Sequence, residues 1–85
     1  MSPKKQLLRS LEDLAKQLNI RLRYEKTSAR GGLCIHRGKH NIIIDPKSSD
    51  DFKIEIIVRS LAAFDLSGFF IPPKLRDLLE AERKE

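Results

Sequence analysis

Apolar residues near the start of the chain recur at intervals of three and four positions. Leu7, Leu11, Leu14 and Leu18 keep this spacing, and charged residues occupy much of the remaining circumference. The period places the leucines on one face of a helix. Ser2 stands where a helix N-cap is expected. The pattern therefore predicts an amphipathic helix that lies on a core.

From position 20 the hydrophobic period changes from about 3.6 to two. Residues 20–25 alternate apolar and charged side chains, which is typical of a half-buried strand. In such a strand Tyr24 faces the core, while Arg21 and Arg23 face water. Asn19 directly before the strand is a plausible left-handed terminator of the preceding helix.

A hairpin follows around Gly38, and its register can be chosen from the apolar pattern. A two-residue turn at Gly38 and Lys39 places the apolar residues of both strands on one face, whereas a three-residue turn scatters them. The predicted pairs are Leu33 with Ile44 and Ile35 with Ile42. Cys34, His36, Asn41 and Ile43 then share the opposite face, and His40 points away from them.

A second helix is predicted over residues 50–64, with Ser48 or Ser49 as its cap, and a third begins at Pro72-Pro73. With 85 residues, the chain is long enough for one domain, 1–85, and too short for two. The predicted fold class is α+β, a small antiparallel sheet of about three strands with two to three helices packed mainly on one face.

Positive charge is concentrated in the first half of the chain. Residues 1–47 hold eleven Lys and Arg against four Asp and Glu, a net of +7; residues 48–85 hold six against eight, a net of −2, which together give the total of +5. Such a pole attracts nucleic acid or an acidic protein, although it is also compatible with a solvated surface.

Six of these cations are expected around one end and the outer face of the sheet. They are Arg21, Arg23, Lys26, Arg30, Arg37 and Lys39. As a nucleic-acid site they would contact phosphates and read little base sequence. Aromatic side chains that could stack on bases are scarce in this region, because Tyr24 is predicted to face the core.

No constellation for catalysis or metal binding emerges from the sequence. Cys34, His36 and His40 are close in sequence, but the preferred register separates His40 from the other two, and a zinc site needs about four converging ligands. A single cysteine excludes an internal disulfide. We find no paired-carboxylate motif and no G-x-S-x-G motif. We therefore expect a protein that is not an enzyme and that uses no cofactor or metal.

The segment Phe69-Phe70-Ile71-Pro72-Pro73 is unusually apolar for a connection between helices. In one interpretation it covers the core and docks the last helix. In the other, Phe69, Phe70 and Ile71 form a partly exposed patch that a protein partner covers.

From Leu11 to Phe64 the chain resembles the ImmA/IrrE-like metallopeptidase domain. A leading helix, the runs LNIRLRYE and RGGLCIHRGKHNIIID, a polar turn and a helix of matching length carry the resemblance. The zinc motif H-E-x-x-H of that family would fall on Arg59-Ser60-Leu61-Ala62-Ala63. None of these residues can hold zinc or activate water, so no catalytic residue carries over. The resemblance implies a zinc-free relative that keeps the helix–sheet–helix scaffold and uses its surface for binding.

The sequence thus favours a small non-catalytic interaction module with an unknown protein partner. The alternative is a nucleic-acid-binding protein that uses the basic face of the hairpin. No apolar run approaches the length of a membrane span. The first residues lead into alternating leucine and charge rather than an apolar signal core, so we expect a cytoplasmic protein.

Overall fold

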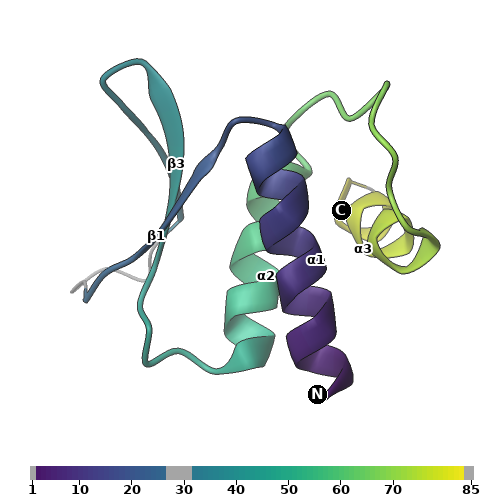
Figure 1. The fold of residues 1–85 in the computed structure, drawn as a ribbon, viewed down its shortest axis with the longest axis horizontal. Helices are drawn as coiled ribbons and strands as arrows, with labels where there is room; N and C mark the ends of the chain where they lie inside the picture. The colour runs from purple at the N-terminus through teal and green to yellow at the C-terminus, as the bar shows by residue number, and fades with distance from the viewer. Residues whose placement is uncertain (1, 27–31, 84–85) are drawn as a thin grey trace.

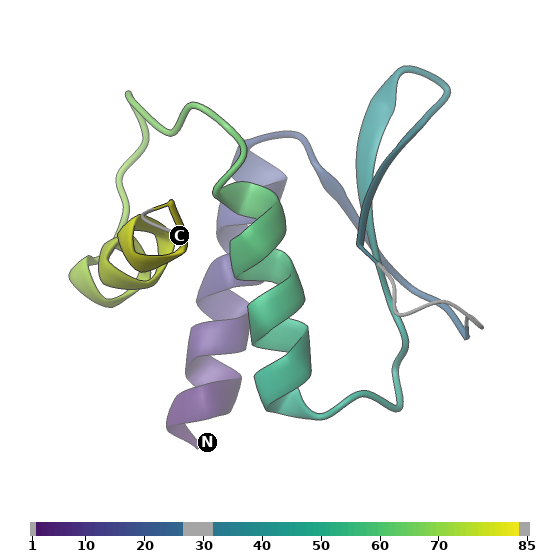
Figure 2. The ribbon, with the colours of Figure 1, turned by 180° about the vertical axis from the view of Figure 1, so that it is seen from behind.

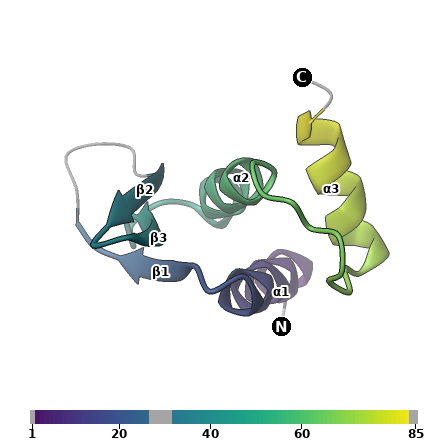
Figure 3. The same ribbon diagram turned by 90° about the horizontal axis from the view of Figure 1, so that it is seen from above.

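The computed structural model describes residues 2–26 and 32–83. Its elements are, in chain order, α1 (Pro3–Gln17), β1 (Arg21–Tyr24), β2 (Gly32–His36), β3 (Lys39–Ile44), α2 (Asp50–Leu61) and α3 (Pro73–Arg83). They form three layers: the sheet, then α1 and α2 side by side, then α3 lying across them on the far side (Figure 1, Figure 3). Figure 2 shows the same order from behind. The predicted α+β class, with the helices on one face of the sheet, is confirmed.

Local signals in the sequence set the ends of the first two helices. The Ser2 hydroxyl accepts a hydrogen bond from the first turn of α1 at 3.3 Å, and the Ser49 hydroxyl does the same for α2 at 3.1 Å. Each serine satisfies a backbone N–H that has no partner within its helix. Asn19 adopts the left-handed conformation (φ 61°) after α1, as the sequence predicted.

The sheet is mixed, and the expectation of a purely antiparallel sheet was wrong for β1. The strand order is β1-β3-β2, with β2 antiparallel and β1 parallel to β3. In Figure 1, α1 and α2 run in the same direction, β1 turns back from the end of α1, and β3 runs down to the start of α2. β1 and β3 therefore both run opposite to the two helices, and this common direction makes them parallel to each other.

The hairpin turn lies one residue earlier than predicted, at Arg37 and Gly38. Both residues have positive φ, 53° and 77°, which is the requirement of a type I′ turn. The resulting pairs are Leu33 with Ile42 and Ile35 with His40. This register differs from the predicted one by two residues, so the faces stay as assigned. Cys34, His36, Asn41 and Ile43 share one face, and His40 lies on the other.

The core lies between the sheet and the helices, and between α3 and the other two helices. Its fully buried large side chains are Leu11, Ile42, Ile44, Ile57, Leu61 and Leu75. The helix-facing apolar side chains of β2 are less buried than those of β3. Leu33 is 38% exposed and Ile35 is 68% exposed, because β2 is the edge strand of the sheet and Ile35 now faces the half-buried His40 across the ladder.

Candidate functional site

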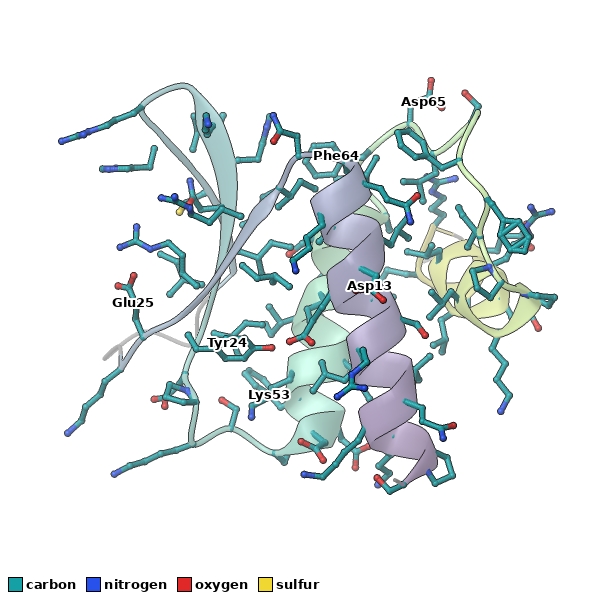
Figure 4. All side chains as sticks on the ribbon, in the orientation of Figure 1. Asp13, Tyr24, Glu25, Lys53, Phe64 and Asp65 are labelled. Carbon is teal, nitrogen blue, oxygen red and sulfur yellow. The ribbon has the colours of Figure 1, made fainter. Side chains whose placement is uncertain are left out.

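Because all three helices lie on one side, no helix or strand of the described residues covers the other face of the sheet (Figure 3). We call this the open sheet face. Its residues follow from the register and are Arg21, Arg23, Cys34, His36, Lys39, Asn41 and Ile43. Figure 4 shows side chains that end in nitrogen projecting from the sheet on the side away from the helices. The carboxylate of Glu25 lies on the same side. The charged residues of the open sheet face are therefore all basic, and Arg21 and Lys39 are exposed.

Most of the cations on or beside this face are not neutralised by a carboxylate. Arg23 forms an ion pair with Glu25. Arg21 and Lys39 are exposed and form no ion pair with any described residue. Lys26 after β1 and Arg37 in the turn are also exposed and form no ion pair with a described residue. Arg30 lies outside the described residues.

At the centre of the open sheet face, Asn41 is only 2% exposed even though no helix covers it. Its Nδ2 donates to the Lys39 carbonyl at 2.9 Å. Arg21 lies beside it on one neighbouring strand and Cys34 on the other. Asn41 is therefore a buried, hydrogen-bonded residue of the central strand with a cationic neighbour on β1.

A groove of ≈ 690 Å³ runs between α1 and β1. It lies within the size range of ligand pockets. We call it the α1–β1 groove. Its lining residues are Arg9, Glu12, Asp13, Lys16, Asn19, Ile20, Arg21, Leu22, Tyr24 and Lys39. Arg9 and Lys16 have no ion pair among the described residues.

Sequence reasoning did not include Arg9 and Lys16 among the site residues. Both lie on the polar face of the amphipathic helix, which the leucine pattern marks only as not facing the core. Their spacing of seven residues was a usable signal that they share one side of α1. Only the position of β1 beside that side turns them into the wall of a groove.

The position of Tyr24 differs from the sequence prediction, which placed its side chain in the core. Its ring is 41% exposed and lines the α1–β1 groove instead of facing the core. Its hydroxyl donates to the carboxylate of Glu12, and the Lys53 Nζ lies 5.6 Å from the ring centroid. Figure 4 shows the ring reaching from β1 toward α1, with Lys53 close to it. The ring therefore contacts α1 through Glu12 and α2 through Lys53.

The environment of Tyr24 also keeps its hydroxyl neutral. Partial burial raises the pKa of the phenol, and the hydrogen bond to Glu12 and the negative charges of Glu12 and Asp50 raise it further. Each of these effects disfavours the phenolate. The groove therefore presents an uncharged aromatic ring at neutral pH.

The three apolar candidates between α2 and α3 do not act as one patch. Ile71 is 8% exposed and belongs to the core, and Phe69 is partly buried against it. Phe70 alone is exposed, at 78%. The segment therefore serves mainly to cover the core, and single exposed apolar residues are common on protein surfaces.

Arg59 and Ser60, which the family resemblance would place at zinc-motif positions, instead make contacts within and between the helices. Arg59 pairs with Glu55 at 2.8 Å and with Glu82 of α3 at 3.1 Å. The Ser60 hydroxyl donates to the Ile56 carbonyl at 2.8 Å. Across residues 2–26 and 32–83, no group of three or more His, Cys, Asp and Glu residues is placed to hold a metal ion.

Comparison of the chain with protein-family models, with curated proteins and with solved structures gave no match. None of the described helices is long and apolar enough to span a bilayer.

Proposed function

We propose that this protein is a small non-catalytic binding module whose ligand is a nucleic acid, held through its phosphates by the open sheet face. The observation that carries the proposal is the placement of Arg21, Arg23 and Lys39 together on the one sheet face that no helix covers. Arg21 and Lys39 have no carboxylate partner among the described residues. An unpaired exposed cation is free to exchange its counterions for a phosphate.

The distribution of charge over the layers supports the same ligand. The basic first half of the chain supplies α1 and the whole sheet, while residues 48–85, which form α2 and α3, are net acidic. A polyanion is therefore attracted more strongly to the sheet side than to the α3 side. Such an asymmetric field steers a charged ligand to one face during association.

A protein partner held at residues 69–71 has weaker support. Docking there requires a contiguous apolar patch, and two of the three side chains are engaged in or against the core. The relationship to the ImmA/IrrE-like domain stays a prediction. A zinc-free relative is compatible with the proposed function, since Arg59 and Ser60 make contacts within the helical layers.

The proposal can be tested by fluorescence anisotropy with labelled DNA and RNA, as single strands and as duplexes of about 12 nucleotides. We expect micromolar binding near 0.15 M salt. If four to six phosphates are contacted, log affinity falls with log salt at a slope of about −3 to −4 for single strands and about −4 to −5 for duplexes.

The decisive comparison uses two double variants with the same change in net charge. Arg21→Ala with Lys39→Ala alters the open sheet face, and Lys74→Ala with Arg76→Ala alters exposed positions of α3. The first is expected to weaken binding and to reduce the magnitude of the single-strand salt slope by about 1.4, at about 0.7 per phosphate. The second should leave the slope unchanged. Equal weakening by both variants, or no binding near 0.15 M salt by the unaltered protein, would refute the proposal.

A further inference from the structure

The α1–β1 groove is continuous with the open sheet face. Arg21 and Lys39 belong to both, since the register places them on the open face and they also line the groove. β1 is the edge strand between the two surfaces. A flexible chain lying on the sheet can therefore pass over this edge and enter the groove without leaving positively charged surface.

The groove has cations on both walls. On the α1 wall, Arg9 and Lys16 stand about 10.5 Å apart along the helix, at 1.5 Å per residue. Arg21 and Lys39 line the sheet side of the groove. All four are free of ion pairs with described residues, so each is available to a phosphate.

The middle of the α1 wall has a different character. Glu12 and Asp13 lie there, between the two cations, and would repel a phosphate. Ile20 and Leu22 contribute apolar surface. A ligand that matches this arrangement carries negative charge at its ends and a flat, uncharged group in between. A nucleotide chain has this form, because its bases are neutral and its phosphates are spaced along the backbone.

The ring of Tyr24 provides the surface on which such a flat group can stack. Tyr24 is 41% exposed, its hydroxyl is hydrogen-bonded to Glu12, and Lys53 lies over its ring. Aromatic side chains in a positively charged groove are the usual means of holding single strands, because every base has a π face. In a duplex the base faces are covered by neighbouring bases, so a duplex cannot use this ring.

We infer that the α1–β1 groove is a single-strand subsite of the nucleic-acid interface, in which Tyr24 stacks on a base and the cations of the two walls contact the flanking phosphates. This inference rests on the proposed function and narrows its ligand to single-stranded nucleic acid.

The composition of the chain makes the groove directly observable. Tyr24 is the sole tyrosine, and there is no tryptophan. Intrinsic fluorescence therefore reports on this ring alone. Addition of single strands of DNA or RNA about 12 nucleotides long should quench the emission, after correction for absorbance, with the same Kd that anisotropy gives. Duplex of equal length should leave the emission unchanged. DNA and RNA strands tested in parallel distinguish the two sources of the ligand.

Variants of the ring separate stacking from hydrogen bonding. Tyr24→Leu should weaken single-strand binding about 5- to 150-fold, the range expected for loss of one stacked base. Tyr24→Phe keeps the ring and loses only the bond to Glu12, so it should bind like the unaltered protein. Arg9→Ala with Lys16→Ala should reduce the magnitude of the single-strand salt slope by about 1.4. Circular dichroism checks that each variant is folded.

The outcomes distinguish failure of the inference from failure of the proposed function. If the variants of Tyr24, Arg9 and Lys16 bind single strands normally while the Arg21 and Lys39 double variant does not, the open sheet face binds nucleic acid and the groove does not. Quenching of Tyr24 by duplex to the same extent as by single strands would also overturn the inference. Absence of any binding overturns both.

Discussion

Arg37 gives a prediction in which stability and binding change in opposite directions. It occupies the first central position of the hairpin turn with φ 53° and is followed by Gly38 at φ 77°. Its side chain is exposed and makes no hydrogen bond or ion pair with a described residue. The substitution Arg37→Asn places Asn-Gly in the turn, which is the residue pair that type I′ hairpins prefer.

The size of the stability change follows from the backbone conformation. A left-handed conformation destabilises the fold by about 1–2 kcal/mol when the residue has a Cβ atom, because of steric crowding. Asparagine recovers part of this through local hydrogen bonds of its side chain. We expect Arg37→Asn to raise the free energy of unfolding by about 0.5–1 kcal/mol. With an m value of about 1 kcal/mol/M for a domain of this size, the urea midpoint should rise by about 0.5–1 M.

Arg37→Asn should lower the affinity for nucleic acid, because it removes one positive charge. Loss of one phosphate contact reduces the magnitude of the salt slope by about 0.7 for single strands and about 0.9 for duplexes. Arg37→Ala is the matched control, because it removes the same charge and keeps a Cβ atom at positive φ without the asparagine amide. The two variants should bind equally weakly, and only the asparagine variant should be more stable than the unaltered protein.

Urea unfolding followed by circular dichroism measures the first effect, and anisotropy titrations at several salt concentrations measure the second. An asparagine variant less stable than the unaltered protein would contradict the type I′ turn. Affinity unchanged in both variants would show that Arg37 does not contact the ligand.

Three further predictions concern the core, the groove and a helix cap. Leu61→Ala, at a fully buried site, should lower the free energy of unfolding in urea by about 3–5 kcal/mol. Leu78→Ala, at a 36% exposed site, should lower it by less than about 1 kcal/mol. Similar losses in the two variants would contradict the packing of α2. Absorbance titration of Tyr24 should show its phenol ionising above the usual pH of about 10, because burial and Glu12 raise its pKa, and Glu12→Gln should lower that midpoint. The linked stability is fully present below about pH 10 and is lost as the pH rises through the folded-state pKa, so Glu12→Gln should reduce the loss of stability on the alkaline side. Ser49→Ala removes the cap of α2 and should cost about 1 kcal/mol; no change in the urea midpoint would show that the cap bond does not form in solution.

The sequence was informative wherever a structural signal is local. The leucine period and Ser2 located α1, and Ser48 or Ser49 bracketed the start of α2. The alternation of apolar and polar residues also assigned the two faces of the hairpin correctly, even though the turn was placed one residue late. A register error of two residues preserves the faces, because side chains on a strand alternate with period two.

Other features depend on contacts between segments far apart in the chain. Strand order and the parallel pairing of β1 with β3 follow from how α1 and α2 lie together, which no local pattern encodes. For the same reason Tyr24 was expected in the core, since alternation gives the face of a strand but not where the covering helix ends. The different exposures of Phe70 and Ile71 likewise depend on how α3 docks.

Taken by itself, the sequence determined which segments form helices and strands, which side of each is apolar, and that the first half of the chain is basic. These are properties of spacing and residue type. The tertiary structure alone decided which polar surfaces meet. It left one sheet face without a helix over it and brought Arg9 and Lys16 of α1 into the lining of the same groove as Arg21 of β1. Contacts between elements depend on how whole helices and strands pack. No sequence pattern therefore identifies residues of different elements that form one surface.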